Sequence, residues 1–271
     1  MGDVGLFGPE SVTWRVHGDP SMLVGGLRAM LLQACHRRAM SAFLAHSGYR
    51  DDHWGRLQRT GDFVDAVTFG TTDEARRAGA RVRGVHRRIP AVTDAVTGRS
   101  YRVDDPDLLL WVHCVEVESF LSTYRRCGGG LTDAEADTYV DEQRAAGALV
   151  GLDIASLPVT VAEIEDYYDS MRPELTVTTA ALEAAVAGAV PPMPAWVQLA
   201  TPARPLWAGV VALAGALLPR WARRLYGVPA LPAADLTATV TGTALRTALL
   251  AVPEDLRRSP RERAARARLA A

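Results

Sequence analysis

The chain has 271 residues, of which 48% are hydrophobic and 23% charged, and this predicts a soluble globular protein with one large domain or two small ones. The formal net charge of −1 excludes the strong positive field that draws proteins to nucleic acid or to an acidic membrane. All 30 basic residues are Arg, so chemistry that needs a Lys amine, such as Schiff-base catalysis, is excluded as well.

The cysteines and the N-terminal residues argue against further classes of protein. Cys35, Cys114 and Cys127 have no C-x-x-C spacing, which argues against a disulfide framework and against a structural zinc site. The N-terminal stretch lacks the basic segment and apolar run of a signal peptide. We therefore expect a cytoplasmic protein.

Apolar residues recur at helical spacing along most of the chain. Ser11 and Ser21 stand where helices begin, Thr132 to Glu135 is a capping-box pattern, and a small hairpin is expected through 97–99. These signals predict helices over 12–16, 22–46, 54–69, 74–89, 107–125, 132–148, 161–171, 176–187, 206–218 and 237–252. The expected fold is all-α, a single multi-helix domain over 1–252 with a charged terminal helix or loose tail over 253–271.

The apolar stretch 206–218 has two interpretations. It is shorter than the roughly 20 residues that a membrane-spanning helix needs, which favours a helix buried in the core. Arg220, Trp221, Arg223 and Arg224 follow it directly, so peripheral membrane contact through 206–224 is the alternative.

Three helical faces place an ionisable group among apolar residues. Arg56 and Thr60 are i, i+4 neighbours on a face that continues with Phe63, and Arg59 lies near the edge of that face. A guanidinium on an apolar face is costly unless it meets an anion. The anion would be a cofactor propionate or a substrate carboxylate, or else Asp52 or Glu116 of the chain itself.

Histidines stand on three of the predicted helices. His86 shares a face with Val82 and Ile89, which suits either an iron ligand or a core histidine. His113 and Glu116 stand at i, i+3, a spacing that serves metal chelation or a hydrogen bond within the helix; without a second copy, a di-iron site is not expected. His36 and Met40, at i, i+4, are compatible with haem, although core Met is commoner.

Signature motifs of several enzyme classes are absent. The sequence has no dinucleotide-binding glycine motif, no P-loop, no G-x-S-x-G and no H-E-x-x-H. Asp51 and Asp52 precede an Arg-rich helix and are interpreted as an N-cap rather than as an acid/base pair.

The order of several short segments carries a resemblance to a known family. The segments are Gly8-Pro9-Glu10-Ser11 with Trp14-Arg15-Val16, Leu31-Leu32-Gln33-Ala34-Cys35-His36, His46-Ser47, Arg56-Leu57-Gln58-Arg59-Thr60, Val85-His86, and Asp105-Pro106-Asp107-Leu108-Leu109-Leu110-Trp111-Val112-His113. Over about residues 7–125 the chain resembles the catalytic domain of MpaB-type oxygenases and rubber oxygenases, also called latex-clearing proteins. The resemblance implies an all-α fold around a b-type haem (haem b) and oxidative cleavage of an isoprenoid C=C bond by O2.

The resemblance also assigns roles to individual residues. Arg56 and Thr60 match the Arg and Thr of the family's Arg-x-x-Lys-Thr motif, and His86 is the best match for the axial iron ligand, with His113 and His36 as alternatives. Arg59 replaces the family's Lys, and because Arg stays protonated it is a poor iron ligand. Arg56, Arg59 and Thr60 would hydrogen-bond bound O2 or the haem propionates.

Three functional hypotheses follow. The first is a haem-dependent oxygenase acting on a small apolar, isoprenoid-like substrate inside the cell. The second is a haem or small apolar ligand binding protein without turnover, suggested by the loss of the family's Lys. The third is a structural or membrane-surface helical protein, suggested by 206–224.

Overall fold

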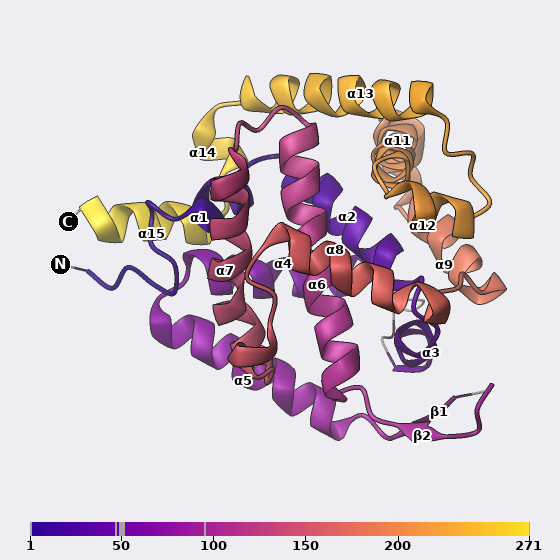
Figure 1. The fold of residues 1–271 in the computed structure, drawn as a ribbon. Helices are drawn as coiled ribbons and strands as arrows, with labels where there is room; N and C mark the ends of the chain where they lie inside the picture. The colour runs from indigo at the N-terminus through magenta and orange to yellow at the C-terminus, as the bar shows by residue number, and fades with distance from the viewer. Residues whose placement is uncertain (1, 47, 49–51, 95, 271) are drawn as a thin grey trace.

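The structure is a computed structural model that describes residues 2–46, 48, 52–94 and 96–270. Its central element is α6 (Pro106–Arg126), which runs through the middle of the molecule (Figure 1). Asp105 caps this helix by accepting a hydrogen bond from the Asp107 N–H, and Pro106 stands in its first turn. Eleven of its 21 residues are buried, as expected of a helix that is apolar on more than one face.

Four helices surround α6 and build the main core with it. They are α1 (Val12–His17), α2 (Met22–Gln33), α7 (Asp133–Val150) and α8 (Val161–Met171). Leu32, Trp111, Phe120 and Tyr168 are among the buried side chains of this core. Gly25 lets α2 lie close to α6, because a Cβ atom there would stand 3.2 Å from the Phe120 ring.

A second group of helices forms the side of the molecule that carries Arg56 and His86. Helix α4 (His53–Phe69) packs against α5 (Thr72–Arg88), and α5 packs against α7. Gly79 permits the α5–α7 contact, since a Cβ atom there would lie 2.6 Å from the Leu149 carbonyl oxygen. A capping box formed by Thr71 and Glu74 begins α5.

The C-terminal third is also helical. It consists of α9 (Thr179–Ala189), α10 (Ala195–Ala200), α11 (Ala203–Ala216), α12 (Arg220–Leu225), α13 (Pro232–Leu250), α14 (Glu254–Arg257) and α15 (Pro260–Ala270). Val211, Leu213 and Ala214 of α11 are buried in a second core against α2. In α15, Ala265 packs against Trp14 and Phe69.

No helix in the described part of the chain is both long enough and apolar enough to cross a membrane. Short 3-10 turns, η1 (Ile154–Ser156) and η2 (Arg172–Glu174), flank α8. The only sheet in the described ranges is a hairpin in which β1 (Val92–Thr93) pairs antiparallel with β2 (Ser100–Tyr101). The mostly helical structure agrees with the all-α prediction, and the small hairpin is confirmed.

One predicted helix is wrong. The sequence predicts a continuous helix over 22–46, but the chain breaks after α2, and a separate helix, α3 (Arg37–His46), follows. At the break, His36 forms an antiparallel bridge with Leu175, and the Cys35 carbonyl accepts a hydrogen bond from the Thr176 N–H. A pairing with a segment so distant in sequence leaves no local signal, because no Gly or Pro marks the break.

Candidate functional site

Arg56 and Thr60 lie together on α4, as their spacing predicts. The Arg56 guanidinium donates a hydrogen bond to Thr60 Oγ1, and the same hydroxyl donates to the Arg56 carbonyl oxygen at 3.2 Å. The guanidinium carbon lies 5.8 Å from the centre of the Phe43 ring, in a cation–π contact. Burial is the main cause of a lowered Arg56 pKa; Arg59 lowers it further, whereas Glu116 opposes the shift.

Arg59 lies elsewhere. Its side chain is 58% exposed and forms a 2.8 Å ion pair with Asp52. Asp52 also accepts a hydrogen bond from the Gly55 N–H at 3.0 Å, so its predicted role as N-cap is confirmed, while Asp51 lies outside the described residues. The Asp52 carboxylate therefore holds Arg59 at the surface.

His86 stands in the last turn of α5, and its ring is only partly accessible. Its Nδ1 is buried, and no group in the described ranges forms a hydrogen bond with it. Burial lowers the His86 pKa, with a smaller effect of Arg56 in the same direction and an opposing effect of Asp104. The ring is therefore neutral at pH 7, which is the form that ligates metals.

The buried face of α5 differs from the predicted one. The helical periodicity of 74–89 predicts that Ala78, Val82, Val85 and Ile89 point inward, but Val85 is 49% exposed. Ala75 and Gly79 are the buried residues of this helix instead. Small residues reveal less in a hydrophobicity pattern than Val does, which explains the error.

His113 and Glu116 share one side of α6 but point to different neighbours. The His113 ring lies against α7, where a Cβ atom on Gly147 would be 3.2 Å from His113 Cε1. Burial lowers the His113 pKa to about 4. The expected hydrogen bond between His113 and Glu116 is not formed, and neither side chain has a hydrogen-bond partner among the residues that the structure describes.

Glu116 is the carboxylate whose charge acts on the pKa of Arg56. Burial raises its pKa to about 7, and the positive charge of Arg56 limits the shift. Helices α4 and α6, which carry these two residues, are not among the closely packed pairs of described helices. Arg56 and Glu116 therefore affect each other's pKa although the backbones of their two helices do not pack closely together.

Sequence reasoning missed a polar network whose Tyr139 lies within the electrostatic influence of Glu116. His17 Nε2 lies 2.9 Å from the Tyr139 hydroxyl, and His17 Nδ1 lies 2.7 Å from Thr68 Oγ1. Burial lowers the His17 pKa to about 3, and Glu116 adds to the elevation of the Tyr139 pKa. These side chains come from α1, α4 and α7, so no single helical face showed them together.

His36 is not part of this cluster. It lies at the start of α3 with its ring centre 5.8 Å from that of Trp111, and its Nδ1 accepts a hydrogen bond from the Ala39 N–H at 3.3 Å. Burial lowers its pKa to about 4, with contributions from Arg37, Arg38 and Glu174 rather than from Arg56 or Glu116. Electrostatic influence thus links His86 and Glu116 to the Arg56–Thr60 pair, whereas His36 lies in a different environment.

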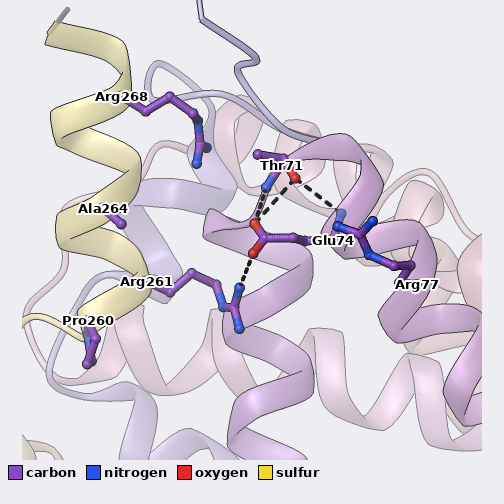
Figure 2. Close-up of a pocket in the computed structure, with 7 residues that line it drawn as sticks. All are labelled: Thr71, Glu74, Arg77, Pro260, Arg261, Ala264 and Arg268. Carbon is purple, nitrogen blue, oxygen red and sulfur yellow. Dashed lines mark hydrogen bonds and ion pairs between the residues drawn. The ribbon is translucent and has the colours of Figure 1, made fainter.

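Two surface hollows lie away from these residues. The larger, of about 600 Å³, lies between α5 and α15, as Figure 2 shows, and its lining residues are Thr71, Glu74, Arg77, Pro260, Arg261, Ala264 and Arg268. Glu74 accepts a 2.9 Å hydrogen bond from Arg261 as well as the capping bond from Thr71 (Figure 2). Because the charges of Glu74 and Arg261 neutralise each other there, we interpret this contact as one that attaches α15 to α5.

Two residues of the cluster fit the cofactor that the sequence suggests. Within the described ranges, no group of three or more His, Cys, Asp or Glu side chains stands ready to hold a metal ion. A haem iron needs one axial side chain and a cation for its propionates. Neutral His86, with a buried nitrogen that lacks a partner, and the Arg56 guanidinium fit these two needs.

Comparison with known proteins gives one match. A family model described as "ER-bound oxygenase mpaB/B'/Rubber oxygenase, catalytic domain" matches residues 14–251. The matched range begins in α1 and ends just after α13, so it includes the whole cluster. Searches of the curated proteins and of the solved structures returned no match.

Proposed function

Because the chain belongs to the family of MpaB-type and rubber oxygenase catalytic domains, we propose that it is a haem-dependent oxygenase that acts on an apolar substrate. The family is of the oxygenase type, so the protein belongs with the oxidoreductases. The haem, the substrate and the bond that is cleaved go beyond the family assignment. One observation supports the haem, namely the buried nitrogen of neutral His86 that lacks a partner among the described residues, within the electrostatic influence of Arg56.

We assign His86 as the axial ligand of haem b, with His113 as the alternative. His86 is neutral, stands near the end of a helix, and lies close enough to Arg56 for the two charges to interact. Arg56, oriented by its hydrogen bond to Thr60, would bind a propionate. A bound haem would supply the iron that activates O2.

Partly buried apolar side chains on the helices that carry Arg56 and Glu116 support an apolar substrate. Val64 of α4 and Leu110 and Val112 of α6 pack at the edge of the main core, and Phe43 lies beneath Arg56. Such surfaces bind hydrocarbon by removing it from water. We propose a small isoprenoid-like alkene, cleaved at a C=C bond.

Glu116 is the proton-holding residue of the proposed site. With a pKa of about 7, its carboxyl group takes up or releases a proton near neutral pH, as a general acid or base must. The charged and titratable groups around it are Arg56 on α4, Tyr139 on α7 with His17 behind it, and His113 on its own helix. His113, with a pKa of about 4, and Tyr139 do not titrate in that range.

One observation favours haem or ligand binding without turnover. Arg59, at the position of the family's Lys, pairs with Asp52 at the surface rather than with the cluster. The side chain at the position of the family's Lys is then directed away from the cluster. Oxygen consumption in the presence of an isoprenoid alkene distinguishes the two functions.

The absorption spectrum of the protein, expressed with ample haem precursor, tests the proposal. We expect a Soret band that shifts on reduction and on addition of carbon monoxide. His86→Ala should fold but lose the band, whereas His113→Ala should keep it. The opposite pattern would move the ligand to His113, and a wild-type protein that takes up no haem would refute the cofactor assignment.

A further inference from the structure

Two arginines hold the last turns of α5, the part of this helix that carries His86. Arg83, three residues before His86, donates a hydrogen bond to the Leu149 carbonyl oxygen at the C-terminal end of α7. Arg102, in the segment between β2 and α6, donates to the Arg87 carbonyl oxygen at 3.1 Å. The last carbonyl groups of a helix have no partner within it, so both contacts satisfy acceptors that the helices themselves leave open.

The packing around Arg83 leaves α5 little freedom to move along α7. Gly79, one turn before Arg83, meets the same residue of α7, because a Cβ atom there would lie 2.6 Å from the Leu149 carbonyl oxygen. Gly151, which ends α7 with a φ of 107°, lies on the other side, where its Cβ atom would stand 3.5 Å from Arg83 Cδ. A displacement of α5 would therefore meet the main chain of α7 or break the Arg83 hydrogen bond.

Arg102 also brings a carboxylate to this turn. The guanidinium that bonds to the Arg87 carbonyl bonds to Asp104 as well, with Nε 2.8 Å from Oδ1 and Nη2 3.3 Å from Oδ2. A single guanidinium therefore separates the Asp104 carboxylate from the main chain next to His86. The pKa shifts agree with this placement. Burial lowers the His86 pKa and Asp104 opposes that shift, while the hydrogen bond from Arg102 lowers the Asp104 pKa and His86 adds to the effect.

We propose that Asp104, held by Arg102, is the outer carboxylate of the axial ligand His86, and that Arg83 fixes the position of the helical turn that carries this ligand. The inference rests on the proposed function, in which His86 ligates haem iron. Carboxylates next to a metal-binding histidine orient its ring and raise the basicity of the ligating nitrogen. Asp104 is a carboxylate whose charge reaches His86, and its own orientation is fixed by two bonds from one guanidinium. All three are positioning residues, because they act through His86.

The exposure of the Arg102–Asp104 pair distinguishes this role from a contribution to stability. The two side chains are 47% and 28% exposed, and an ion pair so exposed contributes little to the stability of a fold. Nor is Asp104 the cap of α6, since Asp105 has that role. Removal of the Asp104 charge should therefore leave the free energy of unfolding nearly unchanged. A change in haem binding would then report on His86.

Asp104→Asn in the full chain tests the proposal, with haem as the probe. The amide keeps the size of the side chain and removes its charge. We expect haem to bind about 10-fold more weakly, the iron–histidine stretching frequency of the ferrous protein to fall and the midpoint reduction potential to rise, because the ligating nitrogen becomes less basic. Asp107→Asn, at an exposed position three residues further along the chain, is the matched control and should equal the wild type in all three measurements.

Arg83→Ala should also weaken haem binding about 10-fold, whereas Arg81→Ala, at an exposed position of the same helix, is the control and should not. Arg83→Lys keeps a charged donor and should recover part of the affinity. Equal haem affinity in the Arg83→Ala and Arg81→Ala variants would remove Arg83 from the proposal. An unchanged potential and stretching frequency in Asp104→Asn, together with haem loss in His86→Ala, would overturn the role of Asp104 and leave the proposed function standing. A wild-type protein that takes up no haem would refute both.

Discussion

Glu116→Gln should change how the stability of the protein depends on pH. Burial raises the Glu116 pKa from 4.5 to about 7, so between these values the folded chain keeps a proton that the unfolded chain has lost. The stability that the protonated carboxyl contributes is fully present below pH 4.5 and is lost as the pH rises through about 7. A shift of this size corresponds to about 3 kcal/mol, because one pKa unit is worth about 1.4 kcal/mol.

The assay is urea unfolding of the wild type and the variant at several pH values from about 4 to about 8. Gln has no proton to lose, so the variant should gain about 3 kcal/mol relative to the wild type across that range. Glu183→Gln, at an exposed position on α9, is the control and should follow the wild type. Parallel curves for wild type and Glu116→Gln would refute the reasoning, because Glu116 would then be no more buried than in the unfolded chain.

Three further predictions concern other parts of the structure. Arg28 is 1% exposed and bonded to Glu118 at 2.6 and 2.9 Å. Arg28→Ala should lower the free energy of unfolding, measured in urea, by about 3–5 kcal/mol, because a partly buried carboxylate loses its partner. A decrease under about 1 kcal/mol would contradict this. Gly79→Ala places a Cβ atom 2.6 Å from the Leu149 carbonyl oxygen. This clash should lower the free energy of unfolding by about 1–3 kcal/mol, although Ala has the better helix propensity. A more stable variant would show that α5 and α7 separate easily. Arg59→Ala should leave haem content unchanged in the absorption spectrum, because Arg59 pairs with Asp52 at the surface; lost haem would place Arg59 in the site.

Local signals explain why most of the fold could be predicted. The capping boxes at Thr71–Glu74 and Thr132–Glu135 and the Asp52 cap depend on residues three apart, and all three begin helices in the structure. The break between α2 and α3 depends on a backbone pairing of His36 with Leu175. Such a pairing is decided by tertiary packing, which a single stretch of sequence does not record.

The contacts of the candidate site likewise fall into those that local sequence predicts and those that tertiary packing decides. The Arg56–Thr60 contact follows from i, i+4 spacing on one helix and was predicted. The contacts of His17 with Thr68 and Tyr139 join residues 51 and 122 positions apart, and periodicity within one helix does not reveal them. Arg59 shows a third case, in which the helical position was right but a long side chain turned toward the carboxylate that caps the helix, Asp52.

Glu116 has no hydrogen-bond partner in the part of the chain that the structure describes, and we attribute this to the packing of its neighbour His113. At i, i+3, His113 and Glu116 were expected to bond to each other, but the absence of a side chain at Gly147 leaves room for the His113 ring against α7. Among the described residues, it is the charge of Arg56, on a helix not closely packed against that of Glu116, that offsets part of the cost of burial. Gly147 thus leaves room for the His113 ring away from Glu116, the carboxyl group of the cluster whose pKa burial raises to about 7.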